Sequence, residues 1–190
     1  KNNWRPFNER KFSICIVGRL SLSKGHRDLL SAFNECIKIN PKLNLLIVGD
    51  GPEKNILRKL TKSLNQKNRV TFLGNIPNKD IGTIFSKCFL SISASKSEAF
   101  GIVNIESLRE GTPIICTNTE GSKDIIVEGK NGFKFDLTKK NDLAKKISLV
   151  LKDWKKYSKG ALQIFEKKYA RHNISFHYQT IINKFEKRNV

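Results

Sequence analysis

The sequence lacks a long hydrophobic run. No stretch of it approaches the roughly 20 consecutive apolar residues that a helix needs to cross a bilayer. Residues 1–10, KNNWRPFNER, contain no apolar segment of the kind found in signal peptides. The sequence therefore predicts a soluble protein. With 190 residues, of which 38% are hydrophobic, it is large enough to bury one continuous core.

Closely spaced cysteines and histidines are also missing. The four cysteines lie far apart, without the C-x-x-C spacing typical of metal sites and redox pairs. The three histidines show no H-E-x-x-H or comparable spacing of metal ligands. Cys15, Cys88 and Cys116 stand in apolar runs, which favours buried free thiols in a reducing cytoplasm. We therefore expect no protein-bound metal.

Acidic residues are scarce relative to basic ones. The chain has 17 Asp and Glu against 36 Lys and Arg, a formal net charge of +19. Such a charge favours anionic partners, which include nucleic acid, acidic lipid head groups and phosphorylated small molecules. Much of the excess is lysine on predicted helix faces, where a solvated surface is the simplest explanation. The aromatic residues fall mostly in core patterns rather than in an exposed RNA-binding motif, so nucleic acid is not the expected partner.

Short apolar runs recur along the chain, with helical stretches between them. Strands are predicted at 12–17, 43–48, 70–73, 88–93 and 113–116. Helices are predicted at 26–40, 53–66 and 105–110, from apolar residues three or four apart or from good helix formers. Strands that are apolar on both faces and alternate with helices predict a parallel sheet covered on both sides, which is a Rossmann-like, doubly wound α/β domain.

The pattern shortens after the fifth predicted strand. A helical piece at 122–128 and a turn at 129–132 precede a small strand at 133–135. The remainder shows amphipathic helical spacing, over 141–154, 157–169 and 174–188. No fixed-period repeat or low-complexity linker is present. We therefore expect residues 1–190 to form one domain with C-terminal helices.

The loops that follow the predicted strands are the candidate sites, because ligands of open parallel sheets bind beyond the carboxyl ends of the strands. The first loop, GRLSLSKGH, runs from Gly18 to His26. Gly18 allows a tight exit from the strand, while Arg19 and Lys24 place two cations where a helix begins and its free N–H groups favour an anion. The loop outlines a diphosphate site. Taken alone, a helix entry with two solvated cations explains it equally well.

The segment from Ser93 to Thr117 carries a more specific pattern, in the order strand, loop, helix, turn and strand. Glu98 falls in the loop, and residues 101–103 would form the first helical turn, with amide hydrogens free to meet a phosphate. Glu106 would reach the same crevice from the second turn. Two carboxylates beside a cationic pocket can accept hydrogen bonds from the vicinal hydroxyls of a sugar or ribose. For an arbitrary pair of glutamates, a loop carboxylate and a solvated helix residue would be the simpler explanation.

Together, these segments resemble the retaining family 4 glycosyltransferases of the GT-B fold. The matching residues, in order, are Gly18-Arg19 with Lys24-Gly25, Gly49-Asp50-Gly51-Pro52, Gly74, Glu98 to Glu106 as E-x7-E, and Gly111-Thr112-Pro113. Each motif is weak by itself, but the ordered set is specific and covers nearly the whole chain. The resemblance implies the C-terminal, donor-binding half of a GT-B enzyme, whose N-terminal acceptor-binding domain lies across a cleft and is absent from this chain.

The resemblance also implies roles for the charged residues. Arg19 and Lys24 would grip the donor diphosphate and stabilise the departing nucleotide. Glu98 would contact the hydroxyls of the donor sugar, and Glu106 those of the ribose. The implied catalytic residues are therefore Glu98, Arg19 and Lys24.

The remaining donor contacts implied by the resemblance are mostly backbone contacts. They involve Gly18, Phe100, Gly101, Ile102 and Val103. The N–H groups at the helix start would do much of the work that a metal does in other glycosyltransferases, so no cofactor is expected. The implied reaction transfers a sugar from a nucleotide diphosphate sugar, above all a UDP-sugar, to a glycan or lipid-linked acceptor with retention, as in bacterial polysaccharide biosynthesis.

One departure from the family pattern affects specificity. Where the family often has Gly-Gly followed by Glu after the fifth strand, this chain has Glu120-Gly121 and then Asp124. The choice of sugar is therefore the least transferable property. At the C-terminus, the segment ISFHYQTIINKF resembles the helix that crosses back to the partner domain, which predicts exposure of Phe176 and Tyr178 when that domain is missing.

Functions of two other classes stay open. A catalytically silent sugar-nucleotide-binding module would bind UDP but transfer nothing, and a basic nucleic-acid-binding domain would lose affinity steeply with salt. Among enzymes, a GT-B epimerase or phosphorylase fits the E-x7-E spacing less well. The expected location is the cytoplasm. Peripheral binding of the full-length enzyme to the anionic inner face of the plasma membrane also stays open.

Overall fold

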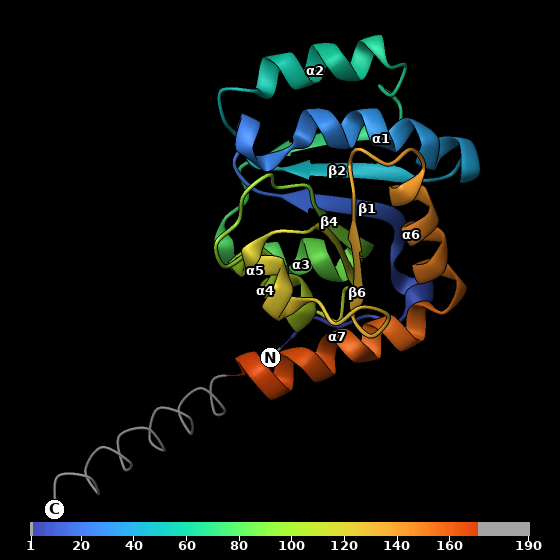
Figure 1. Ribbon diagram of the computed structural model, residues 1–190. Helices are drawn as coiled ribbons and strands as arrows, with labels where there is room; N and C mark the ends of the chain where they lie inside the picture. The colour runs from blue at the N-terminus through green and yellow to red at the C-terminus, as the bar shows by residue number, and fades with distance from the viewer. Residues whose placement is uncertain (1, 171–190) are drawn as a thin grey trace, which may run out of the picture.

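A six-stranded parallel sheet forms the centre of the molecule, seen in a computed structural model that describes residues 2–170 (Figure 1). The strands are β1 (Lys11–Val17), β2 (Asn44–Val48), β3 (Val70–Gly74), β4 (Cys88–Ser93), β5 (Ile114–Thr117) and β6 (Gly132–Phe135). Their order is β3-β2-β1-β4-β5-β6, and every neighbouring pair is parallel. This is a Rossmann-like, doubly wound arrangement, which confirms the predicted fold class.

Helices cover both faces of this sheet. The α-helices are α1 (His26–Ile39), α2 (Lys54–Ser63), α3 (Asn78–Lys87), α4 (Ile102–Arg109), α5 (Glu120–Ile125), α6 (Asp142–Lys152) and α7 (Trp154–Tyr169), and two 3-10 helices are η1 (Phe7–Glu9) and η2 (Leu22–Lys24). On one face α1 packs against α2 and α6, and on the other α4 packs against α3 and α7 (Figure 1).

The central strand β1 shows why both faces must be covered. Ile14 and Ile16 pack with Phe33 of α1 in the largest apolar cluster. The side chain between them, Cys15, points to the opposite face and packs with Phe85 of α3. All these residues are almost fully buried. A strand that buries successive side chains needs helices on both sides, as the continuous apolar run predicts.

The structure corrects several predicted boundaries. Helix α3, over Asn78–Lys87, was not predicted at all. Helix α2 spans Lys54–Ser63 and is shorter at both ends than the predicted 53–66. Helix α5 spans Glu120–Ile125 instead of 122–128. Its N-cap is Thr119, whose backbone N–H donates to the Ser122 hydroxyl at 2.8 Å. The predicted helix at 174–188, with Phe176 and Tyr178, lies outside the described residues.

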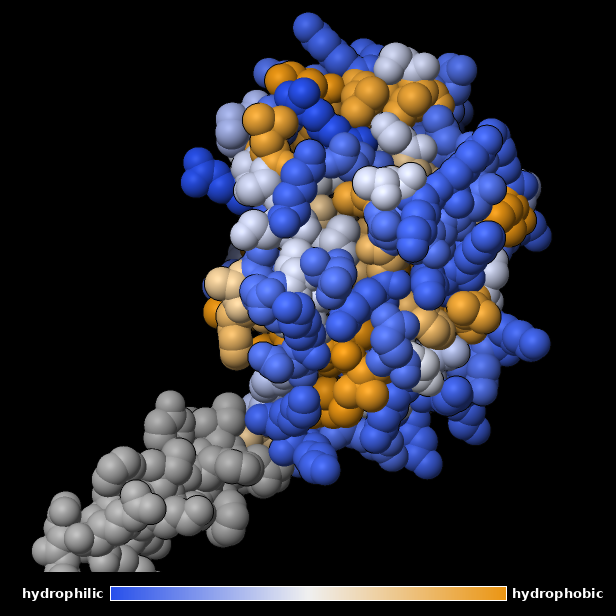
Figure 2. Space-filling view, viewed as in Figure 1, coloured by the Kyte–Doolittle hydropathy of each residue, from blue (hydrophilic) through white to orange (hydrophobic). Residues whose placement is uncertain are grey.

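Hydrophilic side chains cover much of the face shown in Figure 2, in keeping with lysines spread over a solvated surface. All four cysteines are free and buried, which confirms the prediction made for Cys15, Cys88 and Cys116 from their apolar sequence context. Within residues 2–170, no helix is long and apolar enough to span a bilayer. Nor do these residues hold a group of three or more His, Cys, Asp or Glu side chains placed to bind a metal ion.

A buried cation organises the amino-terminal edge of the sheet. Arg10 lies just before β1, is 7% exposed and stacks on the ring of Trp154, 4.8 Å from its centroid. Its guanidinium donates to the carbonyl oxygens of Arg5, Phe85, Cys88 and Glu110 and to the hydroxyl of Thr112, at 2.7–3.2 Å. Burial lowers the pKa of Arg10 to about 10, so the group still carries its charge at neutral pH. The guanidinium of Arg10 thus holds the surrounding loops together through five hydrogen bonds and one ring contact.

Candidate functional site

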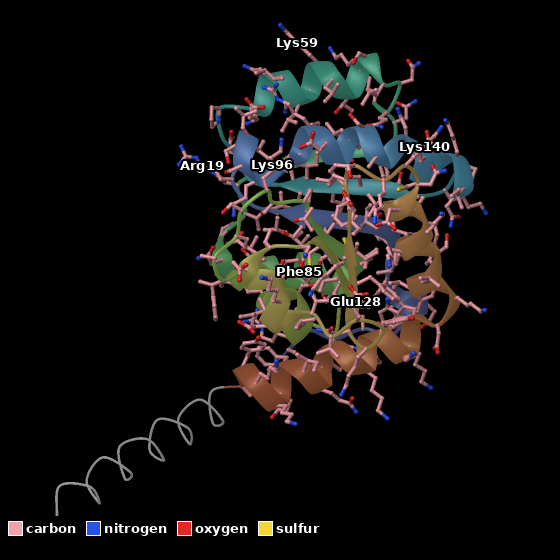
Figure 3. The ribbon with its side chains drawn as sticks, in the orientation of Figure 1. Arg19, Lys59, Phe85, Lys96, Glu128 and Lys140 are labelled. Atoms are coloured by element: carbon pink, nitrogen blue, oxygen red, sulfur yellow. The ribbon has the colours of Figure 1, made fainter. Side chains whose placement is uncertain are left out.

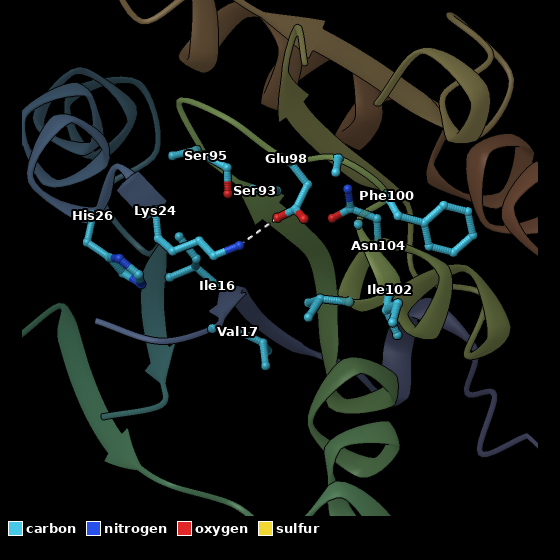
Figure 4. A pocket seen from close by; sticks show the side chains of 15 residues that line it. Ile16, Val17, Lys24, His26, Ser93, Ser95, Glu98, Phe100, Ile102 and Asn104 are labelled. Carbon is cyan, nitrogen blue, oxygen red and sulfur yellow. Dashed lines mark hydrogen bonds and ion pairs between the residues drawn. The ribbon is translucent and has the colours of Figure 1, made fainter. Parts of the chain in front are cut away.

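The opposite, carboxyl-terminal edge of the sheet contains a pocket. The strand order reverses between β1 and β4, and in open α/β sheets such a switch point opens a crevice for ligands. A cavity of about 290 Å³ lies there, between the ends of these two strands (Figure 4). Its lining residues are Ile16 to Gly18, Lys24, His26, Ser93 to Ser95 and Glu98 to Asn104.

Two strand-exit loops meet at this pocket because glycine permits a close approach. Gly25, at φ +67°, ends η2, and a Cβ atom there would lie 1.9 Å from the carbonyl oxygen of Ala94. The N–H of Lys96 donates to the carbonyl of Ser23 at 2.8 Å and joins the loops further. No side chain larger than hydrogen fits between them at position 25, so the loop that carries Lys24 is held against the loop that carries Glu98.

Lys24 and Glu98 form an ion pair across the pocket. Lys24 Nζ donates to Glu98 Oε2 at 2.6 Å, and Figure 4 shows the two side chains pointing toward one another. Their side chains are 33% and 22% exposed. A partly exposed pair of this kind contributes little to stability, so a ligand can separate the two charges at small energetic cost.

Gly121 fixes the position of the Glu98 loop. Its N–H donates to the carbonyl oxygen of Glu98 at 2.8 Å, and a Cβ atom on it would lie 2.7 Å from the backbone of Phe100. The neighbouring Glu120 points instead to Lys123, with 2.6 Å between its Oε1 and the Lys123 Nζ. The departure from the family's Gly-Gly pair therefore keeps the one glycine that the loop packing requires.

The start of α4 faces the same pocket. Gly101 precedes the helix at φ +80°, and no side chain caps the helix N-terminus. The lining residues Ile102 and Val103 therefore have backbone N–H groups without helical partners, which makes this end of α4 suited to an anion. Phe100 and Ile102 are 56% and 64% exposed, and the ring of Phe100 points away from the ion pair (Figure 4).

The structure brings most of the predicted site residues together. Gly18, Lys24, Glu98, Phe100 and residues 101–103 all line the pocket.

Two predicted site residues, Arg19 and Glu106, are not among the residues that line it. Arg19 is exposed, and Figure 3 shows its side chain reaching outward at the margin of the molecule. Glu106 is partly buried on α4; burial raises its pKa, and the charge of Arg109 partly offsets that shift. The roles assigned to these two residues stay predictions.

The turn Gly49–Glu53 packs against residues 18–20 at the exit of β1. A Cβ atom on Gly49 would lie 2.0 Å from the carbonyl oxygen of Gly18, and the N–H of Leu20 donates to the carbonyl of Asp50 at 2.9 Å. Glu53 is buried and paired with Arg27. This turn thus holds the exit of β1 in place.

Three buried polar residues of the pocket were not among the predicted site residues: His26, Ser95 and Asn104. All three are 3% exposed. His26 was considered only as a metal ligand, yet its position directly after Lys24-Gly25 was a sign that it lies at the start of the helix behind the predicted diphosphate site. Burial and, to a smaller extent, the charge of nearby Lys24 lower the pKa of His26 to about 4, while Glu53 opposes the shift. The imidazole is therefore neutral at pH 7.

Comparison with known proteins identifies the family. Residues 2–162 match the family model described as "Glycosyl transferases group 1". The chain belongs to this family. It is 31% identical over 174 residues to the uncharacterized glycosyltransferase YqgM of Bacillus subtilis, an alignment that covers 90% of this chain and 48% of YqgM. For the first three curated relatives, the chain spans only 26% to 48% of the relative's length, which is half or less.

Two solved structures share the fold. Anabaena HepE, solved in complex with UDP and glucose, superposes with a TM-score of 0.78 at 26% identity, over 94% of this chain and 49% of HepE. The C-terminal domain of the group 1 family protein LpcC from Francisella tularensis superposes with a TM-score of 0.75 at 23% identity, over 85% of this chain and 88% of that domain. The second likeness concerns the fold alone.

Proposed function

We propose that residues 1–190 are the C-terminal nucleotide-sugar-binding domain of a retaining family 4 glycosyltransferase, which takes its sugar from a UDP-sugar. The observation that carries this proposal is the Lys24–Glu98 ion pair beside the uncapped start of α4, at the switch point of the sheet. Group 1 family membership and the UDP complex of HepE support the choice of donor.

The chemistry follows from the charges that face the pocket. The ammonium of Lys24 and the backbone N–H groups at the start of α4 can neutralise a diphosphate as it departs, without a metal ion. The Glu98 carboxylate can accept hydrogen bonds from two neighbouring sugar hydroxyls. The family resemblance adds a front-face route in which the departing phosphate helps to deprotonate the acceptor, and so gives retention at the anomeric carbon.

An N-terminal acceptor domain across the cleft would complete the enzyme. Three large apolar side chains are exposed in η2, in the loop before α4 and at the first residue of α4: Leu22, Phe100 and Ile102, with exposed fractions of 60%, 56% and 64%. A group of exposed apolar side chains beside a pocket is typical of an interaction surface. The alignment with YqgM, which covers 48% of that protein, supports the same arrangement. We place the enzyme in the cytoplasm, with a glycan or lipid-linked acceptor.

Titration calorimetry with UDP, GDP and ADP tests the donor assignment. We expect UDP to bind most tightly and its affinity to change little between low and moderate salt. Equal affinity for the three nucleotides would contradict the expected preference for UDP. If UDP does not bind, and if the affinity for an oligonucleotide falls steeply as the salt concentration rises, the nucleic-acid-binding alternative would be favoured.

A UDP-release assay tests the half-enzyme assignment. We expect the 190-residue chain to bind UDP but to transfer no sugar until an N-terminal acceptor domain is restored, because positioning two reactants can account for about 7 to 11 kcal/mol of a barrier. Acceptor-dependent turnover by the chain alone would contradict the assignment. Absence of turnover in the two-domain protein with a range of UDP-sugars and acceptors would favour the non-catalytic binding module.

A further inference from the structure

His26 is a buried polar side chain with no partner in the fold. It is 3% exposed, and among the described residues neither Nδ1 nor Nε2 has a hydrogen-bond partner. A buried polar group without a partner destabilises a fold, so its presence calls for an explanation. His26 also lines the pocket. The side chain is thus both unsatisfied and adjacent to the predicted ligand.

The surroundings of His26 favour an anionic ligand group. The imidazole projects from the first residue of α1, on the side of the pocket that also carries Lys24 (Figure 4). The start of a 14-residue helix and an ammonium group both attract negative charge. The nearby carboxylate of Glu53 is already engaged by Arg27, so it does not satisfy the ring. Of the parts of a nucleotide diphosphate sugar, the negatively charged phosphates best match this side of the pocket.

We propose that His26 donates a hydrogen bond from its imidazole to a phosphate oxygen of the bound nucleotide. The inference rests on the proposed nucleotide-sugar site and adds a ligand contact that neither the motifs nor the resemblance assigned. A neutral imidazole has one N–H donor, and a phosphate oxygen only accepts, so one contact satisfies the donor without moving a charge into the core. Lys24 then supplies the counter-charge, and His26 fixes the direction from which the phosphate is held.

Three variants separate this contact from a packing role. His26→Leu keeps the bulk and removes both nitrogens, while His26→Gln keeps a hydrogen-bond donor. Cys36→Ala, at a buried position further along the same helix and outside the pocket, controls for repacking of α1. Each variant is measured by titration calorimetry with UDP and with inorganic pyrophosphate, and by thermal melting without ligand.

We expect His26→Leu to weaken both UDP and pyrophosphate binding by roughly tenfold to a hundredfold, the range for a lost hydrogen bond to a charged group. It should not lower the melting temperature, since it removes an unpartnered polar group from the core. His26→Gln should keep affinity within a few fold of the original. Cys36→Ala should lower the melting temperature and leave both affinities unchanged.

Nuclear magnetic resonance of the imidazole nitrogens gives a direct readout. Pyrophosphate and UDP should shift the His26 signals, whereas uridine at the same concentration should not. Unchanged signals with saturating UDP, or UDP and pyrophosphate affinities unaltered in His26→Leu, would overturn the inference. Pyrophosphate binding through His26 without any preference for UDP would instead refute the proposed nucleotide specificity and leave the His26 contact standing. Binding of neither probe to the unaltered chain would refute both.

Discussion

Buried polar groups at the two edges of the sheet differ in whether they have hydrogen-bond partners within the fold. At the amino-terminal edge, Arg10 makes five hydrogen bonds and stacks on Trp154. At the carboxyl-terminal edge, His26 is buried without a partner among the described residues, and the start of α4 has no side-chain cap. Polar groups at the first edge are used to hold the chain together. Those at the second are left available to a ligand, which is the usual division in open α/β folds.

The difference also appears in the charges. Glu110, near Arg10, is fully buried and accepts from the Arg109 side chain at 2.8 Å. The Lys24–Glu98 pair at the other edge stays partly exposed. Replacing one partner of a buried charge network is costly, whereas breaking a solvated pair is not. Substitutions at the two edges should therefore separate stability from binding.

The largest effect is expected for Arg10→Ala. The substitution removes the guanidinium that donates to the buried carbonyl oxygens of Cys88 and Glu110 and to the Thr112 hydroxyl, and it should lower the free energy of unfolding by about 3 to 5 kcal/mol. Urea denaturation followed by circular dichroism measures the loss, and the UDP affinity of the folded fraction should be unchanged. A loss no greater than that of Lys24→Ala, for which we expect less than about 1 kcal/mol, would remove the contrast between the edges.

Acid should destabilise the chain through His26. Its pKa is lowered from 6.5 to about 4 in the fold, so below pH 6.5 the unfolded chain takes up a proton that the folded chain does not. The contribution to stability is therefore complete above pH 6.5 and is lost progressively as the pH falls toward 4, by about 3 kcal/mol in total. Urea titrations between pH 7 and 4 should show this loss in the unaltered chain and lack it in His26→Leu. Parallel pH profiles for the two proteins would contradict the assignment.

Sequence patterns predicted the sheet well because the strands are apolar on both faces and stand between clear helical periods. Helix α3 was missed because Gly82 weakens its intrinsic helical preference. In the fold, a Cβ atom at Gly82 would lie 2.7 Å from Glu110 Oε1, so the glycine serves the packing of α3 near the end of α4. Tertiary contacts of this kind override local propensity and are not visible in a single sequence.

The candidate site was predicted as far as motif spacing allows. The pairing of Lys24 with Glu98 depends on Gly25 approaching Ala94, which joins loops about 70 residues apart in the sequence. The motifs suggested that both residues bind the donor, but not that they bind each other. The importance of His26 depends on burial without a partner, a property that arises only when the chain has folded.

A moderate effect on binding is expected for Lys24→Ala and Arg19→Ala. Each should weaken UDP binding by about 1.5 to 3 kcal/mol, or roughly tenfold to a hundredfold, because a charge-assisted contact to the diphosphate is lost. Urea denaturation should show little change in stability, since Lys24 is partly exposed and Arg19 is exposed. Calorimetry with UDP measures the loss. Unchanged affinity in both variants would move the diphosphate site away from this edge of the sheet.

The smallest and most selective effects are expected for the two glutamates. Glu106→Gln should weaken UDP and UDP-sugar equally, by about 1 kcal/mol, if its carboxylate holds the ribose. Glu98→Gln should not weaken UDP binding. The substitution removes the carboxylate that pairs with Lys24, so Lys24 breaks no ion pair when it binds the diphosphate. The same substitution should weaken the UDP-sugar relative to UDP by a similar amount, since the amide accepts sugar hydroxyls less strongly than the carboxylate does. Calorimetry with both ligands on both variants gives the four affinities. Equal losses for UDP and UDP-sugar in both proteins would show that the carboxylates do not divide the donor between them, and the pocket would then hold the sugar through other groups.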